Sequence, residues 1–406
     1  MFPRNVFVWT CAALFLMHAL GGSPGKADES GEFLWGDPHS VFERDTLYGE
    51  EFRSTHRQGV RNPRILVAPD GSVLAFGAGH LRRSEDGGAT WDAARRSFGN
   101  RQVVDEVRGD VLSVSLRENA LWRSRDHGVT WEEEPITVLP NQAMRAAGDA
   151  AVLPGSVHFG GCESGITLAP IQQGAPYRLL MPARYQPYGS NDREYWADNF
   201  NTSVYSDDGG RTWQVSGFFP EGWTGEGTLA ELADGRVYYN SRTHDPATHQ
   251  RRMAHSDDRG ATWTDLRVLE NLYDGGGYDR GYGCNAGLVR LPIEGQDLLL
   301  FSTPDTRGGG RVRMTVWASF DGGRTWPIKR LVYEGPSAYS SLAVGRAGTP
   351  SEGVAFLLFE GGPDGRYSAM QLARFNLSWL LQGEPTGDGE LPAEIAERVL
   401  PSILKN

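Results

Sequence analysis

Five copies of one short motif constrain the fold of this chain more than any other feature. Each copy reads Ser-x-Asp-x-Gly-x-Thr-Trp, and the copies begin at Ser84, Ser124, Ser206, Ser256 and Ser319. The Ser and Asp side chains can bond backbone N–H groups of a turn, the glycine accepts dihedral angles that other residues avoid, and the tryptophan offers a large packing surface. We therefore expect each copy to close a hairpin, with its tryptophan packed between neighbouring sheets.

The spacing of the copies predicts a ring of sheets. Their starts are separated by 40, 82, 50 and 63 residues. A four-stranded propeller blade takes about 40–50 residues, and a ring of blades leaves no long exposed sheet edge. We expect the long gap to hold one unit without the motif. The prediction is an all-β fold, a six-bladed β-propeller of four-stranded antiparallel blades, in which the segment 41–48 adds an outer strand to the last blade and closes the ring.

The two ends of the chain are predicted to lie outside the propeller domain, which spans residues 28–382. Arg4, an apolar run and a small-residue exit are typical of a secretory signal peptide over residues 1–27. The run is short for a membrane span, and an uncleaved membrane anchor is the alternative. We expect a secreted or periplasmic protein with no stable membrane insertion after cleavage. Residues 383–406 should form a tail with a short helix at 392–400.

The charge of the chain restricts its partners. The formal net charge is −11, and removal of Arg4 and Lys26 with the signal peptide takes it to −13. Such an acidic chain binds nucleic acids and anionic membranes poorly, so an anionic substrate needs a local cluster of positive residues. The nine histidines show no metal-ligand spacing, and we predict a monomer without a metal or other cofactor. The sequence leaves open whether Cys162 and Cys284 pair.

Two hairpins are predicted to place charged residues at their open ends. In the first, a turn signal at 234–235 follows a short apolar run, so Glu226 and Arg242 should meet where the strands open. In the second, the same construction should bring Arg61 opposite His80. A carboxylate and a guanidinium would then share one space, with a second guanidinium and an imidazole nearby.

The late part of the chain is expected to add to the same rim. Tyr339 and Glu360 stand at the ends of the last hairpin, and Arg311 begins a strand over 312–318. Arg313 is the alternative to Arg311, because residues two apart on a strand share a sheet face. We favour Arg311 because it stands nearer the start of the strand. Strand pairs with a common axis would deliver all these side chains to one end of the ring.

The motifs and the rim residues resemble those of the sialidase (neuraminidase) superfamily. The five repeats look like its Asp boxes and cover most of the mature chain. The segment Val60-Arg61-Asn62-Pro63 resembles the family's Phe/Tyr-Arg-Ile-Pro motif, with Asn where Ile is usual. The block from Glu226 to Arg242 is similar to the family's Glu-Pro-Ser to Asn-x-Arg block, with Gly227 in place of Pro. Further matches to the family's third-arginine strand, its tyrosine motif and its following Leu-Tyr-Glu are Arg311 to Thr315, Ala338-Tyr339-Ser340 and Leu358-Phe359-Glu360.

The resemblance implies an exo-acting retaining glycosidase for sialylated or other acidic glycans. Planar guanidinium groups suit a carboxylate, so the sugar's carboxylate would be held by Arg61, Arg242 and Arg311. A neutral nucleophile avoids repulsion by that carboxylate, which assigns attack to Tyr339 with Glu226 as its base, through a tyrosyl–glycosyl intermediate. Glu360 would brace Arg61.

The sequence departs from the family where the general acid is expected. Sialidases place an acidic loop between the first hairpin and the first Asp box, and here His80 runs almost directly into Ser84. His80 is the nearest titratable substitute, and a pocket-lining histidine is the alternative. The segment 185–199, with Asp192, Glu194 and Asp198, is a second possible source. Hydrolysis of another ulosonic acid, or binding of acidic glycans without turnover, therefore stays open beside sialidase activity, and a protein-interaction scaffold is the least favoured reading.

Overall fold

The computed structural model describes residues 39–52, 59–141, 156–161, 163–170, 172, 175–187, 193–277, 283–293, 295–308, 310–393 and 395. Four expectations fall outside these residues: the signal peptide, the pairing of Cys162, the acid candidate Asp192, and most of the helix expected at 392–400. Within the described part of the chain, helix is limited to short segments such as α2 (Leu377–Leu380), and none is long and apolar enough to cross a membrane.

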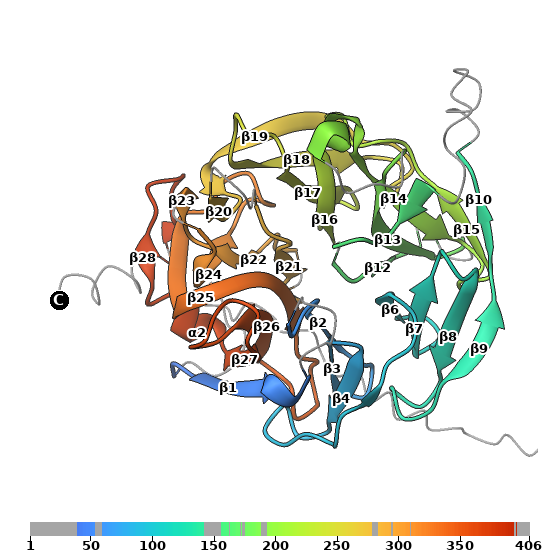
Figure 1. Cartoon of the computed structure of the whole chain (residues 1–406), viewed down its shortest axis with the longest axis horizontal. Coiled ribbons are helices and arrows are strands. Elements are labelled where there is room, and N and C mark those ends of the chain that lie inside the picture. The colour runs from blue at the N-terminus through green and yellow to red at the C-terminus, as the bar shows by residue number, and fades with distance from the viewer. Residues whose placement is uncertain are drawn as a thin grey trace, which may run out of the picture.

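The first half of the described chain folds into three consecutive antiparallel sheets (Figure 1). Blade 1 consists of β2 (Arg64–Val67), β3 (Val73–Gly77), β4 (His80–Ser84) and β5 (Arg95–Arg96). Blade 2 consists of β6 (Arg101–Asp105), β7 (Asp110–Ser115), β8 (Ala120–Ser124) and β9 (Glu132–Pro135). Blade 3 consists of β11 (Val157–His158), β12 (Ile166–Leu168), β13 (Arg178–Tyr185), β14 (Phe200–Ser206), β15 (Thr212–Val215) and the parallel edge strand β10 (Thr137–Leu139).

The second half adds a four-stranded sheet and an eight-stranded one. Blade 4 consists of β16 (Thr224–Glu231), β17 (Val237–Thr243), β18 (Gln250–Ser256) and β19 (Thr264–Tyr273). The larger sheet contains β21 (Gly287–Arg290), β22 (Leu299–Pro304), β24 (Val312–Ser319), β25 (Ile328–Val344), β26 (Ala355–Gly361), β27 (Met370–Phe375) and β1 (Phe42–Tyr48). Short pairs outside this pattern are β20 (Gly276–Gly277) with β23 (Arg307–Gly308), and β28 (Glu384–Pro385) with β25.

The eight-stranded sheet is two blades that share one long strand. Residues 328–336 of β25 pair with β24, and residues 337–344 pair with β26. The inner strands then contact one another around the axis in the order β2, β6, β12, β16, β21, β25 and back to β2. Six inner strands in a closed ring make the six-bladed propeller that the repeats predict (Figure 1).

The ring is closed by its N-terminal strand, as expected. β1 adds to β27 in antiparallel register, with Phe42 opposite Phe375 and Arg44 opposite Ala373. In Figure 1 the blue strand β1 therefore lies beside strands from the end of the chain. This pairing covers the free edge of the last blade and ties the two ends of the domain together.

The repeated motif forms the turn between the third and fourth strands of blades 1 to 5. In the fourth copy, Ser256 Oγ accepts the N–H of Gly260 at 2.7 Å, and Asp258 accepts the N–H of Thr262 at 2.8 Å. Gly260 has a φ of +84°, a value that favours glycine. Trp263 is buried against side chains of blades 3 and 4, such as Leu180. These turns therefore fasten adjacent blades, as the sequence predicts.

The long gap between the second and third motifs does not contain a unit without the motif, so that expectation was wrong. Five consecutive blades carry the motif, and only the sixth lacks it. The extra residues extend blade 3, which has two inner strands, β11 and β12, on β13 and an added edge strand, β10. The number of blades is still six because the last blade supplies the unit without a motif.

Candidate active site

Glu226, Arg242 and Tyr339 form a hydrogen-bonded group near the axis of the ring. Glu226 and Arg242 stand at the open end of the β16–β17 hairpin, and Arg242 Nη1 donates to Glu226 Oε2 at 2.5 Å. Tyr339 comes from β25, far away in sequence, and its hydroxyl donates to Glu226 Oε1. Arg242 Nη1 also lies 3.2 Å from the Tyr339 hydroxyl. A carboxylate, a guanidinium and a phenol thus share one buried contact.

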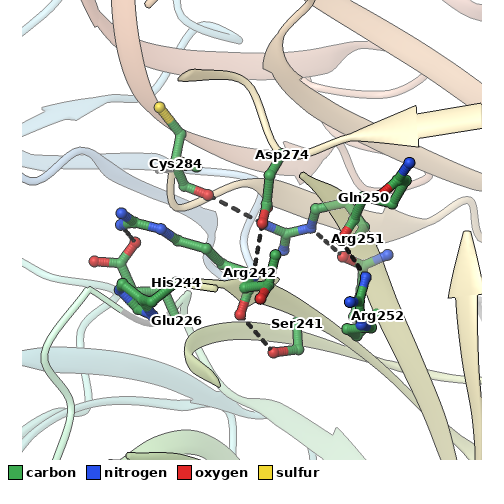
Figure 2. Close-up of polar contacts among 12 residues, drawn as sticks. Glu226, Ser241, Arg242, His244, Gln250, Arg251, Arg252, Asp274 and Cys284 are labelled. Atoms are coloured by element: carbon green, nitrogen blue, oxygen red, sulfur yellow. Dashed lines mark hydrogen bonds and ion pairs between the residues drawn. The ribbon is translucent and has the colours of Figure 1, made fainter. Parts of the chain in front are cut away.

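A buried network fixes the strand that carries Arg242. Arg251 is fully buried on β18, and its Nη1 donates to Asp274 Oδ1 at 2.6 Å and to the carbonyl of Cys284 at 3.1 Å. Asp274 Oδ2 in turn accepts the backbone N–H of Thr243 at 2.6 Å. Figure 2 shows Asp274 beside Arg251 and Cys284, while the Arg242 side chain extends the other way, toward Glu226. The network therefore holds the end of β17 in place.

Arg61, at the entry to blade 1, reaches the Tyr339 side chain from the opposite side of the propeller. Its Nε donates to Glu360 Oε1 at 2.7 Å, and Glu360 also accepts the backbone N–H groups of Asn62 and Tyr339 at 2.8 and 3.1 Å. The Arg61 guanidinium carbon lies 4.9 Å from the centre of the Tyr339 ring. Glu360 is fully buried, so one carboxylate joins the entry to blade 1 with the open end of blade 6.

Arg311 completes the group, and a bulge separates it from Arg313. The Arg311 guanidinium carbon lies 5.3 Å from the centre of the Tyr339 ring, and Arg311 donates to the Tyr367 hydroxyl at 2.7 Å. Arg313 pairs instead with Glu334 at the surface. The register of β24 shifts between Val312 and Met314, and Arg313 has a φ of +63°. The two arginines therefore do not share a face, although they are two residues apart.

Tyr367 is a contact that the sequence did not suggest. Its ring lies 4.1 Å from the guanidinium carbon of Arg61, and its hydroxyl accepts from Arg311. The residue follows β26 in a segment without a motif or strand pattern. One phenol thus holds two of the three arginines in position.

The structure does not bring His80 into this group. Its ring packs edge-on against Phe52 at 5.1 Å between centroids, and its Nδ1 lies 3.0 Å from the carbonyl oxygen of Ala78. Ala78, rather than His80, is the residue opposite Arg61 in the hairpin, since its N–H donates to the Arg61 carbonyl. Of the other acids proposed, Asp192 lies outside the described residues.

The other two acids of that segment do not contact the group either. Glu194 and Asp198, in the 3₁₀ helix η3 (Arg193–Asp198), have exposed side chains and make no described contact with Glu226 or Tyr339. None of the acid candidates drawn from the sequence is therefore seen beside the Glu226–Tyr339 pair in the described part of the chain.

Burial and the neighbouring charges set the protonation states of Glu226 and Tyr339. Burial alone raises the pKa of Glu226, but the charge of Arg242 and the hydrogen bonds from Tyr339 and Arg242 more than offset it, so this pKa lies below its ordinary value. Burial and the charge of Glu226 raise the pKa of Tyr339, although three arginines act against that rise. The carboxylate is therefore ionised and the phenol neutral at neutral pH.

A large cavity of about 1160 Å³ opens beside Arg61. It extends over blades 1, 2 and 3 and reaches Gly161, whose Cα lies directly against the Glu226 side chain. Its described lining contains five arginines and one histidine but no aspartate or glutamate: Arg61, Arg64, Arg96, Arg101, Arg117 and His158. Among the described residues, no group of histidine, cysteine or acidic side chains is arranged to hold a metal.

Glu163 is a buried carboxyl to which the sequence assigned no chemistry. Its Oε1 accepts the Ser341 hydroxyl at 2.7 Å and the backbone N–H of Ser164 at 2.9 Å, beside a cavity of about 280 Å³ between the inner strands. Burial, the largest influence, raises the pKa of Glu163 to about 7, although hydrogen bonds and Arg101 act against it. The carboxyl of Glu163 is therefore mostly neutral below about pH 7 in the folded protein.

Glu163→Gln is expected to flatten the pH dependence of stability. Because the folded pKa is about 7 and the ordinary value is 4.5, Glu163 destabilises the fold as pH rises from 4.5 through 7. The free energy of unfolding of the wild type should fall by about 3 kcal/mol relative to the variant between pH 4.5 and 8. Urea unfolding at both pH values measures this difference. The exposed control Glu118→Gln should show the same pH dependence as the wild type. If the stability of Glu163→Gln changes with pH as much as that of the wild type, the raised pKa of Glu163 is wrong.

The chain is similar to several known proteins. Residues 25–350 match the family model described as a BNR repeat-like domain. A sialidase of Micromonospora viridifaciens is 28% identical over 83% of this chain and 55% of its own length. A sialidase of Paraclostridium sordellii is 25% identical over 68% of this chain and 74% of its own length. The Hadza microbial sialidase Hz136 has a similar structure, with a TM-score of 0.60, 23% identity, and coverage of 80% of this chain and 67% of that one. The chain thus spans about half the length of the Micromonospora relative.

Proposed function

This chain belongs to the BNR repeat-like domain family and to the exo-sialidase superfamily, and on that premise we propose that it is a sialidase-like glycoside hydrolase. It would release a terminal sialic acid, or a related 2-keto acid sugar, from a glycan, with retention of configuration. The signal peptide predicted from the sequence would direct it out of the cytoplasm, as a secreted or periplasmic protein. The observation that carries the proposal is the hydrogen bond from the Tyr339 hydroxyl to Glu226, with three arginines around the same phenol.

The arginines support recognition of the sugar's carboxylate. Arg61, Arg242 and Arg311 come from three blades and are each held by a partner that fixes the guanidinium plane: Glu360, Glu226 and Tyr367 respectively. Planar guanidinium groups held in this way bind a carboxylate with two parallel hydrogen bonds. The phenol between them would then lie next to the carbon that bears this carboxylate in a 2-keto acid sugar.

The pair formed by Tyr339 and Glu226 supports covalent catalysis. The Tyr339 oxygen would attack the anomeric carbon as its proton passes to Glu226, while the bond from that carbon to the leaving oxygen breaks. The leaving oxygen would depart as an anion and take a proton from solvent. Water would then attack the anomeric carbon from the face that the leaving group had occupied, and would release a proton to solvent. As the bond between that carbon and the Tyr339 oxygen breaks, Glu226 would return its proton to Tyr339. Two inversions at one carbon give net retention. Arg242 stays beside both groups and stabilises the charge on the carboxylate.

The lining of the cavity also favours a second function, binding of acidic glycans without turnover. No aspartate or glutamate stands among the described residues that line the cavity, so no described carboxyl is placed there to protonate a leaving group. A chain with this site can bind the sugar while it cleaves only bonds to good leaving groups. A different ulosonic acid as substrate fits the same observation.

Release of sialic acid from a fluorogenic sialoside tests the proposal. We expect turnover with an aryl leaving group, and we expect kcat/KM to fall steeply as the pKa of the leaving alcohol rises, because a general acid contributes most to poor leaving groups. Nuclear magnetic resonance of the first product should show the same anomer as the substrate. Tight binding of a sialic-acid transition-state analogue without hydrolysis of any ketoside would favour the binding function, and an inverted first product would exclude the tyrosyl intermediate.

A further inference from the structure

The cavity beside Arg61 is larger and more positive than one carboxylate requires. Its volume of about 1160 Å³ exceeds the range of about 300–1,000 Å³ that holds a drug-sized ligand, so more than one sugar unit can enter. The described lining gathers five arginines in a chain whose net charge is −11. Only one of them, Arg61, belongs to the group around Tyr339. The other four face a part of the cavity that the proposed mechanism does not use.

Arg64 is the strongest sign that this part of the cavity binds a ligand. It is the first residue of β2 and is 8% exposed, yet its guanidinium forms no hydrogen bond or ion pair with any described residue. Its Nε is buried without a partner. Glu163 is the described carboxyl whose charge acts on Arg64, but it bonds to Ser341 and Ser164 instead. A buried guanidinium without a partner is costly unless an anion completes it.

Arg101 stands next to Arg64 on the neighbouring blade. It begins β6, is buried, and donates from Nη1 to the carbonyl of Asn100 at 2.7 Å. Arg64 and Arg101 are the first residues of β2 and β6, two inner strands that contact each other, and both residues line the same cavity. Arg96 and Arg117 line the same cavity from exposed positions. Positive charge therefore continues from the buried pair to the exposed part of the cavity.

We propose that Arg64 and Arg101 form a second anion subsite, which binds a second acidic group of the same glycan. The ligand is an oxyanion, either a sulfate ester or the carboxylate of a second acidic sugar. This proposal rests on the proposed function, because the first carboxylate of that glycan is held by Arg61, Arg242 and Arg311. Both kinds of oxyanion satisfy the N–H groups that Arg64 leaves unpaired. Preference for a substrate with two negative groups follows from this geometry.

The proposal is tested by comparing substrates that differ in one acidic group. Fluorogenic sialosides are prepared with no further acid, with a sulfate ester, and with a second sialic acid, and kcat/KM is measured for each. The wild type should prefer at least one doubly acidic substrate by about tenfold, equivalent to about 1.4 kcal/mol. In Arg64→Met this ratio should fall toward 1. The control Arg324→Met, an exposed arginine in the fifth motif, should keep the wild-type ratio. Equal kcat/KM values for all three substrates would overturn the proposal.

A second measurement does not depend on turnover. Millimolar inorganic sulfate, at constant ionic strength in chloride, should raise the unfolding temperature of the wild type and of Arg324→Met more than that of Arg64→Met. Without sulfate, Arg64→Met should unfold at a higher temperature than the wild type, because the substitution removes a buried charge that has no described partner. Sulfate stabilisation without hydrolysis of any sialoside would contradict only the proposed function. Identical sulfate responses of wild type and Arg64→Met would contradict only the subsite.

Discussion

Glu226→Gln is expected to lower kcat/KM for a fluorogenic sialoside by roughly 10²–10⁴-fold, the range for loss of one acid–base group. The amide cannot accept the proton that the Tyr339 hydroxyl now donates to Glu226. Tyr339→Phe removes the nucleophile itself and should cause a loss at least as large. Steady-state kinetics of the purified variants, with circular dichroism to verify folding, measures both effects.

A matched control separates this effect from a general loss of charge in blade 4. Glu270 lies on β19 of the same blade, is exposed, and has no described side-chain contact. Glu270→Gln should therefore retain wild-type kinetics. Turnover within twofold of the wild type in both Glu226→Gln and Tyr339→Phe would exclude the proposed chemistry.

The acid limit of activity follows from the same pair. Because Arg242 and the hydrogen bonds outweigh burial, the pKa of Glu226 lies below its ordinary value of 4.5. The base is then ionised at every pH above 4.5, and the acid limb of the kcat/KM profile should lie below that value. An acid limb near pH 6 would assign the controlling titration to another group.

The residue pairs that meet at the open ends of hairpins could be predicted from the local sequence. The turn at Asp234-Gly235 sets the register of β16 and β17, so Glu226 and Arg242 had to meet at the open end. The last hairpin likewise brings Tyr339 to Glu360. Six consecutive β-sheet units then favour a closed ring, because a ring buries both faces of every sheet.

The remaining features of the site depend on contacts between segments that are distant in the sequence, and local sequence patterns do not predict such contacts. Arg313 turns away from the site because a bulge shifts the register of β24, and strand alternation predicts the opposite. The burial of Glu163 and Arg64 arises where strands from several blades converge. His80 is of a residue type that often transfers protons, but it packs on Phe52, a residue that precedes the propeller's first inner strand. Such environments are decided by tertiary packing.

Arg242→Met is expected to destabilise the fold by about 3–5 kcal/mol, the range for removing one partner of a buried ion pair. Arg242 and Glu226 are 4% and 5% exposed, so methionine would leave the Glu226 carboxylate buried, with the Tyr339 hydroxyl as its one remaining hydrogen-bond partner among the described side chains. The double variant Arg242→Met/Glu226→Gln removes both charges and should recover much of the loss. Urea unfolding of the four proteins measures the coupling between the two residues.

The surface pair Arg313–Glu334 provides the control for this cycle. Both side chains are largely exposed, at 39% and 68%, so Arg313→Met should change stability by less than about 1 kcal/mol. Without Arg242, burial should raise the pKa of Glu226, so the Arg242→Met variant should lose stability further as pH rises through that new pKa. If the double variant loses as much free energy of unfolding as the two single variants together, Glu226 and Arg242 act independently. The stability of the site would then have to come from the Asp274 network, and not from the ion pair beside the phenol.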